Sequence, residues 1–171
     1  MATDFRRSWL RRLGVGTAVA MLGVVGSGPA VAATATTTIS VSLVIQSGCA
    51  VSATALNFGT ATVLAVPIYQ TSNVNVTCTD ETAYNIGLDN GANSLSGQRR
   101  MIGPASETVS YNLYQDSGHT LAWGNTIGTN TISGAGTGNT QLFIVYGEVL
   151  GPQASPDPGG YADIVNVTVT Y

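Results

Sequence analysis

The sequence predicts an all-β sandwich, and three observations lead to this fold class. Short apolar runs with a period of two recur along the chain, and turn-forming Gly, Asn, Asp and Pro residues separate them. No segment has the apolar spacing of three to four residues that an amphipathic helix needs. Two cysteines, Cys49 and Cys78, lie in two of the apolar runs, where a disulfide would join the first core strand to a neighbouring one.

The first 32 residues have the composition of an export signal. Four arginines between residues 6 and 12 precede a stretch of small and apolar residues at 13–25, and Ala30-Val31-Ala32 provides a cleavage site. A membrane anchor fits poorly, because the apolar stretch is short and glycines interrupt it. We therefore expect a mature chain of residues 33–171 that the general secretory route exports through the periplasm, in preference to the twin-arginine route.

The expected mature chain is acidic and contains few charged residues. It has two arginines and no lysine against eight acidic residues, which leaves a net charge of −6. Nucleic-acid binding needs a basic surface that neutralises phosphates, so this function class is excluded. Abundant Thr, Ser, Asn, Gly and Ala fit a surface that faces changing media or packs against copies of itself.

Eight strands are expected along the chain. They cover residues 39–45, 49–57, 72–78, 83–88, 101–102, 108–114, 141–149 and 164–171. Asn90-Gly91 predicts a tight turn after the fourth of these strands. Residues 134–139 are expected to form a flexible glycine-rich loop, and residues 151–160, with three prolines, a long connection before the last strand.

The first and last expected strands each carry an apolar face. The face that we call the donor face consists of Ile39, Val41, Leu43 and Ile45. The face that we call the closing face consists of Val165, Val167, Val169 and Tyr171. The ends of a chain are normally where order is lost. Apolar-faced strands at both ends therefore predict subunits that complete one another.

Cys49 and Cys78 are expected to form a disulfide, because export delivers the chain to an oxidising compartment. Closing a loop of this length contributes about 3–4 kcal/mol in the chain-entropy description. The alternative is a zinc site, which needs four ligands. Two thiols and the single His119 are too few, so we expect no metal.

The sequence offers little for catalysis. The acidic residues are scattered over turns, and Glu107 and Glu148 are the pair left open as converging carboxylates of a glycoside hydrolase. No other motif accompanies them. We expect neither an enzyme nor a cofactor.

Aromatic residues leave open a glycan-binding alternative. Trp123, Tyr111, Tyr114 and Tyr146 could form a platform on which sugar rings stack. Aromatic residues in strands more often belong to the core or to cross-strand pairs, so this reading ranks lower.

Six short motifs follow one another in a fixed order along the expected mature chain. They are Gly48-Cys49, Leu56-Asn57-Phe58-Gly59, Val76-Thr77-Cys78, Leu88-Asp89-Asn90-Gly91, Tyr111-Asn112-Leu113-Tyr114-Gln115-Asp116, and Gly160-Tyr161-Ala162-Asp163 followed by Val167-Thr168-Val169-Thr170-Tyr171. In this order the chain resembles the spore-coat-protein-U-like pilins, which are the subunits of archaic chaperone–usher pili. The short glycine-rich stretch at 134–139 departs from the family's pattern.

The resemblance implies an incomplete immunoglobulin-like β-sandwich that is completed by donor-strand complementation. The implied organisation is a signal peptide at residues 1–32, a donor-strand segment at 33–47 and a pilin domain at 48–171. The donor face would enter the groove of a neighbouring subunit. The closing face would form one wall of the groove that receives a strand, first from a chaperone and then from the next subunit.

The resemblance also implies a function. The chain would be a structural pilin subunit that polymerises by donor-strand exchange into a cell-surface fibre for adhesion and biofilm formation. Its implied partners are copies of itself or related pilins, a periplasmic chaperone and an outer-membrane usher. Two alternatives stay open: a spore-coat or envelope structural protein of the same fold, and a monomeric secreted β-sandwich that binds glycans.

Overall fold

The computed structural model describes Gly28, residues 31–154 and residues 156–171. Apart from Gly28, Val31 and Ala32, the predicted export signal lies outside these residues. The chain divides into two units, Met1–Ser42 and Leu43–Tyr171. In the described part of the first unit every residue is exposed and no strand forms. Within the described ranges no helix is long and apolar enough to cross a membrane.

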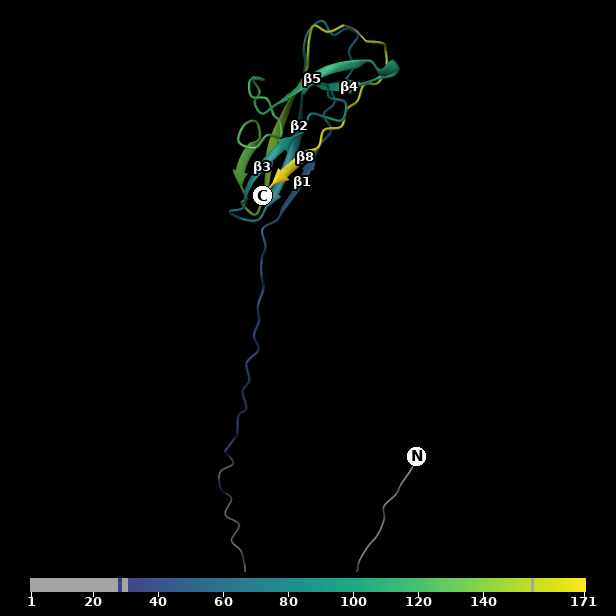
Figure 1. The fold of residues 1–171 in the computed structure, drawn as a ribbon. Helices are drawn as coiled ribbons and strands as arrows, with labels where there is room; N and C mark the ends of the chain where they lie inside the picture. Colours follow the sequence, from purple (N-terminus) through teal and green to yellow (C-terminus); the bar gives the residue numbers. More distant parts are fainter. Residues whose placement is uncertain (1–27, 29–30, 155) are drawn as a thin grey trace, which may run out of the picture. The chain divides into compact units, whose positions relative to one another are not determined.

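Two antiparallel sheets form the second unit, which confirms the predicted all-β sandwich (Figure 1). In sheet order, the larger consists of β1 (Cys49–Ala53), β2 (Ile68–Cys78), β7 (Thr140–Val149), β5 (Thr108–Tyr114) and β4 (Arg99–Ile102). The smaller consists of β6 (Ile132–Ala135), β3 (Ala83–Leu88) and β8 (Val167–Thr170). A short 3₁₀ turn, η1 (Pro104–Ser106), precedes β5.

The core lies between the sheets and follows from the alternation within each strand. In β5, and in β2 from Ser72 onward, every second residue is buried, and these positions are apolar except Ser72. The fully buried side chains are Trp123, Tyr84, Ile86, Leu88, Val74, Val76 and Cys78. Trp123 ties the two sheets together, because its backbone N–H donates to Leu113 O of β5 at 2.8 Å and its indole N–H donates to Ile86 O of β3 at 3.0 Å.

One strand was not expected from the sequence. Residues 134–139 were predicted to be a loop, but Gly134 and Ala135 belong to β6, which pairs with β3. A Cβ built on Gly134 would lie 2.6 Å from the hydroxyl of Tyr84, its register partner. Glycine is needed there because the tyrosine ring crosses the backbone of β6.

Six of the eight expected strands differ from those observed. β2, β4 and β7 begin four, two and one residues earlier than expected. The other three differ as follows. Residues 31–48 form no strand, so the expected strand at 39–45 has no partner among the residues that the structure describes. The second expected strand ends at Ala53, and Thr54 makes the last backbone bond to β2, from its N–H to Asn73 O at 2.9 Å. The last is confined to Val167–Thr170, because the backbone of Ile164 and Asn166 bonds to the loop after β3 through Ala92 N–H and Asp89 N–H.

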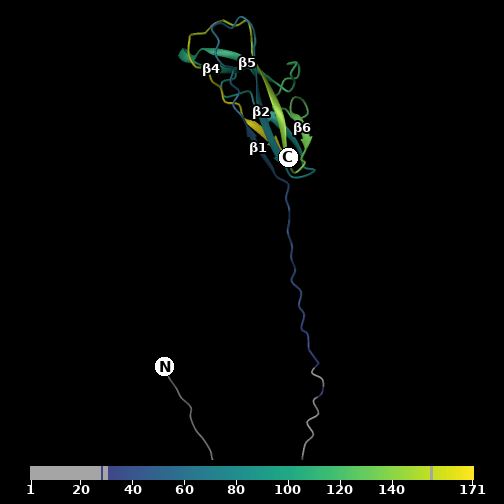
Figure 2. The ribbon, with the colours of Figure 1, turned by 180° about the vertical axis from the view of Figure 1, so that it is seen from behind.

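On one side of the sandwich, no strand of the described residues bridges the edges of the two sheets. β1 is the edge strand of the larger sheet and β8 is the edge strand of the smaller one. Figures 1 and 2 show the two strands side by side, seen from opposite directions. The two strands belong to different sheets, and no ladder joins them.

Candidate strand-acceptor groove

The edge strand β8 forms one wall of the opening. Among the described strands it pairs with β3 alone, and Val167 and Val169 lie opposite Leu88 and Ile86. The inward side chains of β8 therefore extend the core toward the open edge, where its outward backbone N–H and C=O groups are free to pair with an added strand.

An open cavity of about 410 Å³ lies where β1 ends and β8 begins, between the segment 53–58 and the segment 161–167. The end of β1 and the residues that follow it line one side, from Ala53 to Leu56, and Val165 and Val167 line the other. Core residues from both sheets, among them Leu88 and Leu113, form its floor. Since the end of β1 meets the beginning of β8, the two edge strands run in opposite directions.

A second cavity of about 830 Å³ continues the first. The two share Ala55, Leu56, Phe58, Met101 and Tyr161. The segments 55–64 and 156–161 form much of the lining of the second cavity. Together the cavities make an elongated apolar groove, which we call the acceptor groove.

Leu56 and Phe58 cover the floor of the groove where the two cavities meet. They pack over Gly147 of β7, where a Cβ would lie 2.5 Å from Leu56 Cδ2 and 2.9 Å from Phe58 Cζ. The Phe58 ring also lies against Tyr111, with 6.3 Å between the ring centroids. Sequence reasoning recognised the motif that contains Leu56 and Phe58 but did not assign them to the groove.

Asp163 fixes the segment that leads into β8. Its carboxylate accepts hydrogen bonds from Tyr111 Oη at 2.7 Å, from Asn93 N–H at 3.1 Å and from Asn93 Nδ2 at 3.0 Å. Gly91 leaves room for it, because a Cβ at this position, where φ is +80°, would lie 1.9 Å from Asp163 Oδ2. The motif that ends in Gly91 and the motif that ends in Asp163 are therefore in direct contact.

Asp89, directly after β3, makes a second attachment to the segment that leads into β8. It accepts hydrogen bonds from Asn166 N–H at 3.0 Å and Asn166 Nδ2 at 2.6 Å, and from Gly91 N–H at 2.9 Å. Partial burial opposes ionisation of this carboxyl. The bonds from Asn166 and Gly91, and the positive charge of Arg99, outweigh burial and lower the pKa of Asp89.

Arg99 supports this end of β3 from within. Its side chain is buried and donates to the backbone carbonyls of Leu88 at 3.0 Å, Asp89 at 2.8 Å and Trp123 at 2.8 Å. These carbonyls belong to segments that the strand ladders leave incompletely paired. Burial lowers the pKa of Arg99, and the nearby Tyr111, Asp89 and Asp163 raise it.

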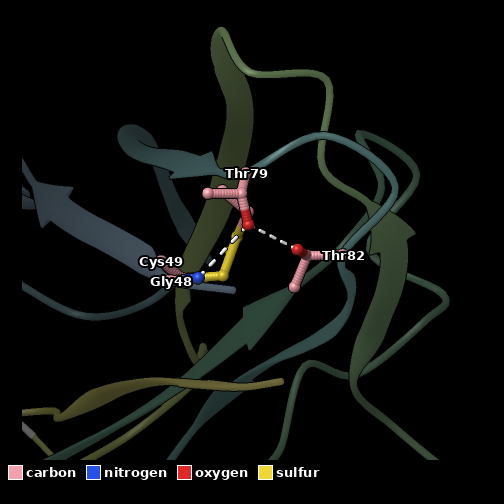
Figure 3. The surroundings of a disulfide bond; sticks show 5 residues. Gly48, Cys49, Thr79 and Thr82 are labelled. Atoms are coloured by element: carbon pink, nitrogen blue, oxygen red, sulfur yellow. Dashed lines mark hydrogen bonds between the residues drawn. A yellow bond between two sulfur atoms is a disulfide. The ribbon is translucent and has the colours of Figure 1, made fainter. Parts of the chain in front are cut away.

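The structure confirms the predicted disulfide. Cys49 and Cys78 are joined with an S–S distance of 2.03 Å, and the two residues are also register partners at the start of β1 and the end of β2. Figure 3 shows the bond beside Gly48, Thr79 and Thr82. Among the described residues, no group of His, Cys, Asp and Glu side chains is placed to hold a metal ion.

The two apolar faces predicted from the sequence have different surroundings. The donor face is exposed: Ile39 is 85%, Val41 92%, Leu43 84% and Ile45 79% accessible. In the closing face, Val165, Val167 and Val169 pack against the core, whereas Tyr171 is exposed.

The remaining candidate residues do not come together as a site. Trp123 and Tyr111 are buried in the core, so the four-residue stacking platform does not form. Glu148 accepts a hydrogen bond from Tyr114 Oη at 2.8 Å, and Glu107 accepts one from Tyr161 Oη at 3.3 Å. The two carboxylates therefore belong to separate hydrogen-bonded groups.

Comparison with known proteins identifies the family. The model of the Spore Coat Protein U domain matches residues 35–168, which include the whole donor face, strands β1 to β7, the lining of the groove and the first two residues of β8. This chain belongs to the spore coat protein U family. Protein U of Myxococcus xanthus is 33% identical over 174 residues, covering 92% of this chain and 96% of that protein.

A solved structure supports the fold assignment. The chain is similar to part of the chaperone–tip adhesion subunit pre-assembly complex CsuC–CsuE of the archaic Csu pili of Acinetobacter baumannii, with a TM-score of 0.57 and 24% sequence identity. The similarity covers 74% of this chain and spans 40% of the matched chain. It shows that the spore coat protein U domain has the immunoglobulin-like sandwich found in that complex.

Proposed function

We propose that this protein is a structural pilin subunit that polymerises by donor-strand exchange. One observation carries the proposal: the sandwich has an open apolar groove between β1 and β8, and the same chain has an exposed apolar face on its N-terminal segment. An extended segment added along β8 would pair with its free edge and place alternate side chains in the groove.

The magnitudes agree with such an exchange. Burying the four side chains of the donor face contributes roughly 6–12 kcal/mol, at about 1.5–3 kcal/mol for each. This is comparable with the whole stability of a typical domain, about 5–15 kcal/mol. A subunit with an empty groove should therefore be marginally stable, and replacement of a poorly fitting strand by a better one can drive assembly without a nucleotide.

The proposal includes partners that would occupy the groove in sequence. A periplasmic chaperone would add a strand first, and at an outer-membrane usher the segment 33–47 of the next subunit would replace it. The name of the solved Csu complex, which pairs a chaperone with a pilus subunit, supports the first partner. The product would be a cell-surface fibre for adhesion and biofilm formation, with no enzymatic role.

The test compares two aspartate substitutions in the donor segment. Leu43→Asp places a charge on the donor face, where an apolar groove would have to bury it, whereas Ser42→Asp adds the same charge on the opposite face. We expect Leu43→Asp to abolish fibres and the heat-resistant ladder of oligomers on gels, and Ser42→Asp to retain both. Negative-stain microscopy of material sheared from cells that also express the chaperone and the usher provides the readout.

The control and the contradictory outcome follow from the same pair. Both variants should be exported in equal amounts, because neither residue packs in the domain core. Wild-type ladders from Leu43→Asp would overturn the assignment of the donor face.

A second candidate function is a spore-coat or envelope structural protein of the same fold. The match of residues 35–168 to the Spore Coat Protein U domain favours it. Electron microscopy distinguishes the candidates, because a coat protein would form layers on the cell or spore surface where a pilin forms fibres.

A further inference from the structure

We propose that the disulfide Cys49–Cys78 is a mechanical staple that transfers tension from the N-terminal segment past β1 to β2. The inference rests on the proposed function in one respect: in the cell, the fibre would supply the tension. It concerns the point at which a pull on the N-terminal segment enters the folded domain.

β1 is a weak place for tension to enter. It has only five residues and is paired along one edge, with β2. A pull on the N-terminal segment enters the folded domain at Gly48 and Cys49, at the beginning of this strand. Without a cross-link, the five-pair ladder and the hydrogen bonds of Gly48 would carry the whole tension.

β2 is a much stronger element. It has 11 residues and is paired along both edges, with β1 on one side and ten register pairs to β7 on the other. Cys78 is its last residue and lies directly opposite Cys49. The disulfide thus connects the entry point of the chain to a central strand of the larger sheet by a covalent bond.

A hydrogen-bonded clamp lies on the outer side of the disulfide. Gly48 N–H donates to Thr79 Oγ1 at 3.2 Å, and Thr79 N–H donates to Gly48 O at 3.0 Å (Figure 3). The hydroxyls of Thr79 and Thr82 are 2.6 Å apart and hold the turn that follows β2. Gly48 is therefore attached to the same end of β2 as Cys49.

The position of the staple matters because β1 also lines the acceptor groove. Ala53 and the residues after it form one side of the cavity in which a donor strand would lie. If tension stripped β1 from β2, that side of the groove would be lost and the strand held there would be released. With the disulfide in place, a pull on the N-terminal segment would not detach β1, so the acceptor groove would keep the donor strand bound in it.

The test is single-molecule pulling on the mature chain, residues 33–171, held by handle proteins fused to its two ends. The chain is folded in the oxidised state and measured with and without dithiothreitol, so that the disulfide is not needed for folding during the experiment. Reduction should add roughly 100 Å to the released length, since the 29 residue steps between the cysteines contribute about 3.5 Å each. This increment reports that the bond is open.

We expect the reduced chain to rupture at a clearly lower force and to show an early short extension as β1 leaves the sheet. Equal rupture forces in the two states would overturn the proposal. The measurement uses single chains, so a failure to form fibres would count against the proposed function and leave this test intact.

Thr54→Val provides a matched control at the far end of β1. It removes the contacts of Thr54 Oγ1 with Ser72 Oγ at 3.1 Å and with Asn73 N–H at 3.0 Å. We expect it to lower the thermal unfolding midpoint and to leave the rupture force of the oxidised chain unchanged. A fall in rupture force equal to that caused by reduction would show that resistance follows overall stability, and the staple would be rejected.

Discussion

At the scale of single residues, two aspartates determine where the end of the chain lies. Asp163 accepts bonds from Tyr111 and Asn93, and Asp89 accepts bonds from Asn166. Both lie just before or opposite β8, a strand too short to hold its own register firmly. Side-chain hydrogen bonds thus fix the approach of the strand to the groove.

Asp89 gives the domain a stability that depends on pH. Its pKa is lower in the folded chain than the ordinary value of 3.8, so ionised Asp89 stabilises the fold at pH values above that ordinary value. This contribution is lost as the pH falls through the lowered folded-state pKa. We expect Asp89→Asn to unfold at a lower urea concentration than the wild type at neutral pH, and the gap to close as the pH falls below about 4.

The measurement is urea unfolding of both chains across pH 2–7 or so, followed by tryptophan fluorescence. Asp80→Asn, on the exposed turn after β2, is the control and should follow the wild type. A constant gap between Asp89→Asn and the wild type at all pH values would show that the carboxylate charge is irrelevant to the attachment.

At the scale of elements, β8 has two different faces. Val167 and Val169 pack against the core, while Thr168 and Thr170 are exposed. The strand is therefore part of the core and part of the proposed groove at once, whereas the donor face belongs to neither the core nor the groove of its own subunit.

This difference predicts two distinct defects. Val169→Asp puts a charge on the core-facing side of β8, next to Ile86, at a cost of several kcal/mol unless the group is neutralised. We expect a low periplasmic level and no co-purification with the chaperone. Leu43→Asp should instead accumulate as a chaperone-bound monomer, because its own groove is intact.

Thr170→Asp is the matched control for Val169→Asp, since it adds the same charge to the exposed face of the same strand. It should behave as the wild type in both periplasmic level and chaperone capture. Equal accumulation of Val169→Asp and Leu43→Asp with the chaperone would mean that β8 is not a groove wall.

At the scale of the whole molecule, the domain is a sandwich with one open side. The groove between β1 and β8 exposes part of the core, and an edge strand with free backbone groups borders it. Filling that side should affect the stability of the entire second unit, because the groove floor includes side chains from both sheets.

A peptide test follows from this coupling. The mature Leu43→Asp chain, which cannot donate its own segment, should be stabilised by a synthetic peptide of residues 37–47. At a free concentration about 100 times its Kd, a ligand that binds only the folded state adds about 2.7 kcal/mol to the free energy of unfolding. Differential scanning calorimetry with increasing peptide measures the shift.

The same peptide with Leu43→Asp is the control and should have no effect. If the two peptides raise the melting temperature equally, or neither does, the donor face does not recognise the groove.

The sequence alone determined the features that depend on local pattern. Alternating apolar residues predicted β3 and β5 with the bounds that the structure has, because each strand's inward side chains are apolar and its ends carry turn residues. The disulfide was predictable for a different reason. The sequence has two cysteines, Cys49 and Cys78, so only one pairing is available in a chain that is expected to be exported.

Only the tertiary structure decided the features that depend on a partner. Residues 39–45 alternate as clearly as any strand, yet form none, because a strand needs a neighbour and no described segment of the chain pairs with them. Conversely, β6 exists despite its glycines because Tyr84 and β3 hold it. The groove arises because no strand of residues 43–154 and 156–171 lies between β1 and β8. The residues that line it come from distant parts of the sequence, so no local pattern identifies them as one site.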